Sequence, residues 1–122
     1  MSNLNQINVL GNILETTWGK SSDEYGCTAR FESNILRITY STVVYLASER
    51  SMNSQIPRVA LEANERVKAR LDSLKKEYKD IMGEALTLKE ISNNDKVDLV
   101  QASSVNPRRV AMFRKFVDLE IG

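Results

Sequence analysis

Between Ala60 and Ala85, mostly apolar residues recur at alternating spacings of four and three positions. The line comprises Ala60, Asn64, Val67, Leu71, Leu74, Tyr78, Ile81 and Ala85. This spacing places the side chains along one narrow stripe of an α-helix. Pro57 suits the first turn of such a helix and Gly83 its end, so the sequence predicts a long helix over residues 57–82.

The surface that this helix packs on is predicted to be a β-sheet of the same chain. From Ile35 to Leu46 one parity is apolar and the other begins polar, as in a strand with one buried face. Cys27 to Glu32 would be its partner in a hairpin over residues 27–46, with Ser33 and Asn34 in the turn. A strand rises about 3.3 Å per residue and a helix about 1.5 Å, so the two elements match in length.

Residues 1–26 comprise a short N-terminal helical or extended segment followed by a polar loop. Residues 86–122 are predicted to be strands, at 86–91, 97–103 and 110–121, with a turn at 93–96. Lys115 alone interrupts the apolar face of the last strand. The predicted fold class is α+β, a single domain of residues 1–122 in which one long helix packs on a twisted antiparallel sheet.

A helical interpretation of the last third stays open at this point. Asp98 to Lys115 resembles the helix-turn-helix of bacterial repressors, although Val100 and Ser104 depart from the small residue and the glycine that the family favours. The resemblance implies a small DNA-binding regulator using residues 98–115, with the long helix for dimerisation. Its DNA-facing residues would be Asn106, Arg108, Arg109, Arg114 and Lys115.

Composition excludes several classes of function. The chain has no histidine and a single cysteine, Cys27, which excludes Ser-His and Cys-His nucleophiles, a disulfide framework and a thiolate zinc site. Seventeen basic and sixteen acidic residues give a formal charge of +1, so no general field for polyanions is implied. We therefore expect neither an enzyme nor a cofactor or metal. No apolar run approaches the roughly 20 residues that span a bilayer, so we expect a cytoplasmic protein without a membrane partner.

These features favour a structural protein that acts by contacts with copies of itself and with neighbouring proteins. In layout, with Ser/Asn-rich connections, one heptad-like helix and a closing β segment, the chain loosely resembles small head, neck or tail proteins of tailed bacteriophages. That resemblance implies self-association or docking within a virion assembled in the host cytoplasm, without cofactors. The expected contact residues are Leu4, Ile7, Leu10, Trp18 and Asn64.

Overall fold

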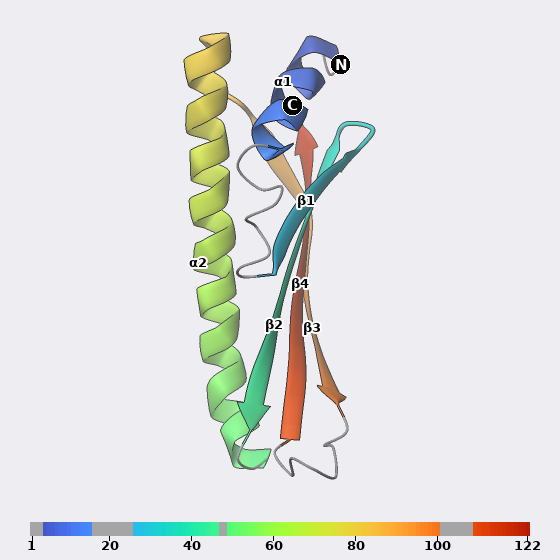
Figure 1. Ribbon diagram of the computed structural model, residues 1–122, viewed down its shortest axis with the longest axis vertical. Helices are drawn as coiled ribbons and strands as arrows, with labels where there is room; N and C mark the ends of the chain where they lie inside the picture. Colours follow the sequence, from blue (N-terminus) through green and yellow to red (C-terminus); the bar gives the residue numbers. More distant parts are fainter. Residues whose placement is uncertain (1–3, 16–25, 47–48, 101–108) are drawn as a thin grey trace.

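The computed structural model describes residues 4–15, 26–46, 49–100 and 109–122 and has an α+β fold (Figure 1). The elements follow in the order α1 (Leu4–Leu14), β1 (Cys27–Glu32), β2 (Ile35–Leu46), α2 (Glu49–Met82), β3 (Leu88–Val100) and β4 (Arg109–Ile121). The four strands form one sheet in the order β1-β2-β4-β3, and all neighbours are antiparallel. Helix α2 runs along one face of this twisted sheet, and α1 lies at one end, against α2 and β1.

The core lies between α2 and the sheet, on what we call the inner face. Strands β2 and β4 turn alternate residues toward it, and their register pairs Leu36 with Leu119 and Ile38 with Val117. The buried apolar residues of the two central strands are Leu36, Ile38, Tyr40, Val44, Ala111, Phe113, Val117, Leu119 and Ile121. Helix α2 contributes to this core the buried residues Ala63, Val67, Leu74 and Tyr78. The apolar line of the helix is therefore used largely within the molecule.

Three members of that line are not in the core, and one of them, Ala85, follows the end of α2 and is exposed. The other two are Asn64, which lies at the margin of the stripe, and Ile81, which lies in the last turn of the helix; both are exposed. A repeat with a mean spacing of 3.5 residues drifts relative to a helix with about 3.6 residues per turn, so a straight helix cannot press every member onto one surface. Helix α2 therefore packs most closely on the sheet between Ala63 and Tyr78, where its buried residues lie.

Helix α2 begins at Glu49 rather than at the predicted Pro57. Pro57 lies inside the helix and is exposed, so its ring faces solvent. A proline in a helix interior removes one hydrogen bond and costs about 3 kcal/mol. Ile56, just before it, packs partly buried against the core, and this contact favours continuation of the helix through the proline.

The predicted turn at residues 93–96 is wrong, because β3 continues through it from Leu88 to Val100. A bulge between Glu90 and Ser92 shifts the register, after which Asn93 pairs with Val117 and Asp95 with Lys115. The run of Asn, Asp and Lys is typical of turns. Here two of its side chains, Asn93 and Asp95, instead bind Lys115 of the neighbouring strand.

The helical interpretation of the last third is also wrong where the structure describes it. Asp98 to Val100 belong to β3 and Arg109 to Lys115 to β4, both extended and paired with each other. Alternation decides this outcome, since Ala111, Phe113 and Val117 lie on the buried face and Arg114 and Phe116 on the other. Residues 101–108, with the predicted Asn106 and Arg108, lie outside the described part of the chain.

One buried hydroxyl leads to a stability prediction. Tyr78 is 1% exposed, and its Oη has no hydrogen-bond partner among the described residues. An unsatisfied buried hydroxyl carries a desolvation cost, so Tyr78→Phe is expected to raise the free energy of unfolding by about 1 kcal/mol. Urea denaturation measures this, and Tyr45→Phe, at a side chain that is 59% exposed, is the matched control with a change within about 0.5 kcal/mol. A loss of stability in Tyr78→Phe would mean that the hydroxyl has a partner.

Candidate interaction site

Strand β3 forms one edge of the described sheet. This strand has thirteen residues and pairs with β4 on one side only. We call its other side, from Leu88 to Val100, the β3 edge. Among the described residues no strand pairs with the β3 edge, so it presents unpaired N–H and C=O groups. Such an edge is a template for pairing with another chain.

Several apolar side chains of β3 are exposed along this edge. Ile91, Val97 and Leu99 are 45%, 38% and 60% exposed. Val97 and Leu99 pair with the buried Phe113 and Ala111, so they stand on the inner face of the sheet. Helix α2 packs chiefly on β2 and β4, and it leaves Val97 and Leu99 of β3 exposed. The β3 edge therefore combines free hydrogen-bonding groups with apolar surface.

A polar cluster lies beside this apolar surface. Lys115 points to the inner face and is only 4% exposed. Its Nζ donates a hydrogen bond of 2.5 Å to Asn93 Oδ1 and lies 3.2 Å from Asp95 Oδ1. Asp95 is 40% exposed, so the cluster opens to solvent at the β3 edge. The buried ammonium is thereby paired and hydrogen-bonded, as burial of a charge requires.

The opposite, outer face of the sheet carries a chain of ion pairs. Arg37 lies 2.9 Å from Glu32 and 3.6 Å from Asp118, and Glu32 also lies 3.1 Å from Arg30. Ser92 donates a hydrogen bond to Asp118. A shallow hollow of about 510 Å³ covers this region, with Phe116 at one side. Because both arginines face carboxylates, the hollow is not a free cationic site for a phosphate or a nucleic acid.

On the other margin of the sheet, a second stretch of strand edge has no partner strand among the described residues. Strand β1 pairs with β2 only as far as Cys27 opposite Tyr40, and Ser41 N–H donates to Gly26 O. Beyond Ser41, β2 borders a hollow of about 370 Å³ between the strand and α2. Its lining includes Val43 and Tyr45, which are 43% and 59% exposed.

Cys27 is a structural thiol in this fold. It is fully buried at the start of β1, and burial raises the pKa of its thiol above the ordinary value, against the attraction of the Arg70 guanidinium. The thiolate is the reactive form, so the raised pKa and the lack of access for a reagent both slow the chemistry of Cys27.

We expect native Cys27 to react with a disulfide reagent at least about tenfold more slowly than an exposed thiol, because reaction requires exposure and deprotonation. The control is Leu61→Cys, which adds a thiol on α2 at a position that is 59% exposed. The variant should consume one equivalent promptly and the second only after unfolding. Prompt reaction of both thiols would contradict the buried position of Cys27.

The sequence-predicted contact residues are separated by the fold. Leu10 of α1 is fully buried, so it belongs to the core and not to a contact surface, which corrects the prediction. Ile7 is half-buried, and Asn64 is exposed and remains available. Trp18 lies outside the described residues, and of Leu4 only the backbone is described.

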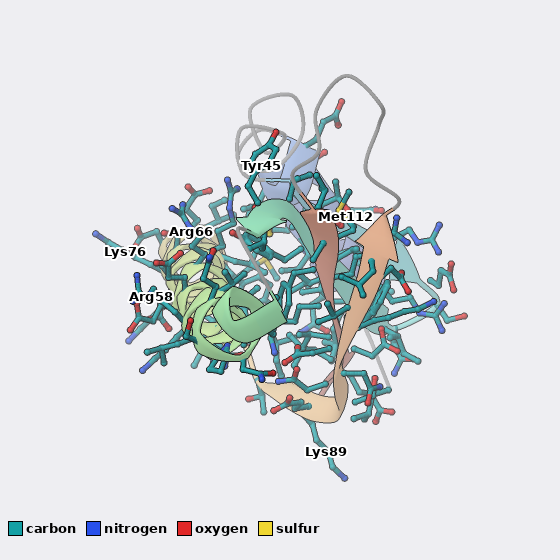
Figure 2. All side chains as sticks on the ribbon, turned by 90° about the horizontal axis from the view of Figure 1, so that it is seen from below. Tyr45, Arg58, Arg66, Lys76, Lys89 and Met112 are labelled. Carbon is teal, nitrogen blue, oxygen red and sulfur yellow. The ribbon has the colours of Figure 1, made fainter. Side chains whose placement is uncertain are left out.

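The predicted DNA-facing residues are not brought together either. Arg114 is exposed on the outer face of β4, whereas Lys115 is buried on the inner face and bound to Asn93 and Asp95. Lys115 is therefore corrected from a DNA contact to an internal ion-pair partner. Of Arg109 only the backbone is described, as the first residue of β4. On α2, Arg58 and Lys76 project away from the sheet, as Figure 2 shows.

No group of three or more His, Cys, Asp or Glu side chains in the described ranges is placed to hold a metal ion. In the same ranges no helix combines the length and the apolar character needed to cross a bilayer. Comparison of the chain with protein-family models, with curated proteins and with solved structures gives no match.

Sequence reasoning missed the cluster around Lys115, although its signal was present. A lone lysine on an otherwise apolar strand face needs a partner. The polar residues Asn93 and Asp95 could have been recognised as that partner once β3 and β4 were aligned. The exposed apolar residues of β3 gave no such signal, because exposure depends on where α2 lies.

Proposed function

We propose that the protein is an assembly component that acts through protein–protein contacts and self-association. The single observation that carries the proposal is the β3 edge, thirteen residues long and unpaired within the described chain, with Val97 and Leu99 exposed beside it. Charged residues and the bulge between Glu90 and Ser92 protect the first part of this edge, as in many natural proteins, whereas the part from Val97 onward exposes two apolar side chains. The proposed role is binding and assembly rather than catalysis.

The larger structure that this component joins is proposed to be a virion. The support is the loose likeness in layout to small head, neck or tail proteins of tailed bacteriophages. A rigid helix-on-sheet block suits that role, because its contacts hold their geometry when many copies assemble. Neighbouring structural proteins would be its other partners, and assembly would take place in the cytoplasm of the host cell.

Light scattering on the full chain across a concentration series tests self-association. We expect the particle mass to exceed the 13.8 kDa of one chain and to approach a fixed multiple of it. A mass of one chain at every concentration would contradict the proposal.

Two leucine variants show whether the β3 edge is responsible. Leu99→Lys places a charge on the inner side of the β3 edge and is expected to lower the particle mass. Leu61→Lys is the matched control, because Leu61 on α2 is 59% exposed and Leu99 is 60% exposed. If the two variants lower the mass equally, the effect does not come from the β3 edge.

A further inference from the structure

The C-terminal half of β3 has a charge pattern that is complementary to itself. Lys96 and Asp98 lie on the outer face, where Lys96 Nζ is 3.9 Å from Asp98 Oδ2, and they are 63% and 44% exposed. Asp95, Val97 and Leu99 alternate with them on the inner face. The strand therefore presents an opposite charge on either side of one valine.

We propose that β3 pairs antiparallel with β3 of a second copy, around a two-fold axis at Val97. This inference rests on the proposed self-association and names its surface. Pairing around this axis, perpendicular to the sheet, would join two sheets into one and keep both α2 helices on the same side. Contacts of this kind are isologous, so each copy offers the same surface.

The charges select this register. When a strand pairs antiparallel with its own copy, same-face residues meet and one residue faces itself. Centres at Asp95, Lys96 or Asp98 would each place two like charges directly opposite, which is destabilising. Centres at Asn94 or Leu99 leave Lys96 without an opposite charge, and in the first of these Asp98 would meet Lys89 only across the bulge. With Val97 at the centre, Lys96 of each copy faces Asp98 of the other.

The remaining side chains tolerate this register. Val97 meets Val97 of the second copy, an apolar pair that removes exposed surface from water. Asp95 would lie opposite Leu99, and its charge is already balanced by Lys115 of its own chain, 3.2 Å away. Helix α2 lies over β2 and β4, so it leaves the inner face open beside Val97 and Leu99.

Mixing two charge-reversal variants tests the register. Lys96→Glu alone would make every outer-face contact across the axis acid against acid, and Asp98→Lys alone would make each one base against base. For each variant alone, we expect the protein concentration needed for association to rise at least about tenfold, because two repulsive contacts weaken the pairing. Mixed in equal amounts, they restore opposite charges in both contacts, so the mixture should regain the mass of the unmodified protein.

Restoration on mixing cannot arise from the ion pair within one chain, because neither variant regains that pair. Lys76→Glu, on the solvent face of α2, is the control and should leave the particle mass unchanged. If the unmodified protein is oligomeric and both variants keep its mass, the two-fold pairing is overturned while the proposed self-association stands. If the unmodified protein has the mass of one chain throughout, the proposed self-association itself fails.

Discussion

Phe113→Ala is expected to lower the free energy of unfolding by about 3–5 kcal/mol, whereas Phe116→Ala in the same strand should cost less than about 1 kcal/mol. Phe113 is fully buried on the inner face, and its truncation leaves a cavity beneath α2. Phe116 is 39% exposed on the outer face, where solvent fills the space left by truncation. Urea denaturation followed by circular dichroism measures both.

This pair also separates the two interpretations of the last third. Residues three apart lie on one side of a helix but on opposite faces of a strand. Similar losses at Phe113 and Phe116 would therefore contradict β4. Because a loss of 3–5 kcal/mol approaches the total stability of many domains, Phe113→Leu, with a smaller reduction in volume, gives a second value if Phe113→Ala does not fold.

Asp95→Ala is expected to lower the free energy of unfolding by about 2 kcal/mol, which is large for a side chain that is 40% exposed. The substitution leaves the buried ammonium of Lys115 with Asn93 as its remaining partner in the cluster. The cost falls below the roughly 3–5 kcal/mol of a fully buried broken pair because water reaches this side of β3. Denaturant unfolding of Asp95→Ala, of Lys115→Met and of the variant that carries both substitutions measures the coupling between Asp95 and Lys115.

Adding Lys115→Met to Asp95→Ala should recover most of the loss, because an apolar side chain of similar length needs no partner on the inner face. Asp80→Ala, at an exposed position on α2, is the control and should change stability by less than about 0.5 kcal/mol. If the double variant is no more stable than Asp95→Ala, the cost does not come from the unpaired ammonium. In that case the cluster would have no special role in β3.

The sequence specified the elements whose local pattern agrees with their surroundings. Strand β2 and its hairpin partner occupy the residues from which alternation predicts them, because one face is buried throughout. In β4 the same alternation prevailed over the helical signals, and Phe113 and Val117 lie in the core. The strongly periodic part of α2 packs on the sheet, as the α+β prediction requires.

Predictions failed where a distant contact outweighs the local signal. Asn93 and Asp95 have turn chemistry, yet they face a lysine twenty residues or more along the chain. Pro57 has the chemistry of a helix start, yet the contact of Ile56 with the core accompanies a helix that begins earlier. Periodicity within one segment contains no information about either partner.

The candidate site was the least predictable part. The expected contact residue Leu10 is in the core because α1 packs against α2 and β1. The exposure of Val97 and Leu99 follows from the position of α2 over the two central strands, which no single segment specifies. Unpaired edges are a property of strand order, and that order becomes known only when β4 is placed between β2 and β3.

Hydrogen exchange measured on dilute and concentrated protein tests the central claim most directly. If copies of the chain associate through the β3 edge, exchange of the amides between Leu88 and Val100 slows with concentration as outward N–H groups gain partners. Amides of α2 provide the internal reference and should not change. Exchange in β3 that is independent of concentration, in a sample whose particle mass rises, would contradict the β3 edge as the assembly surface.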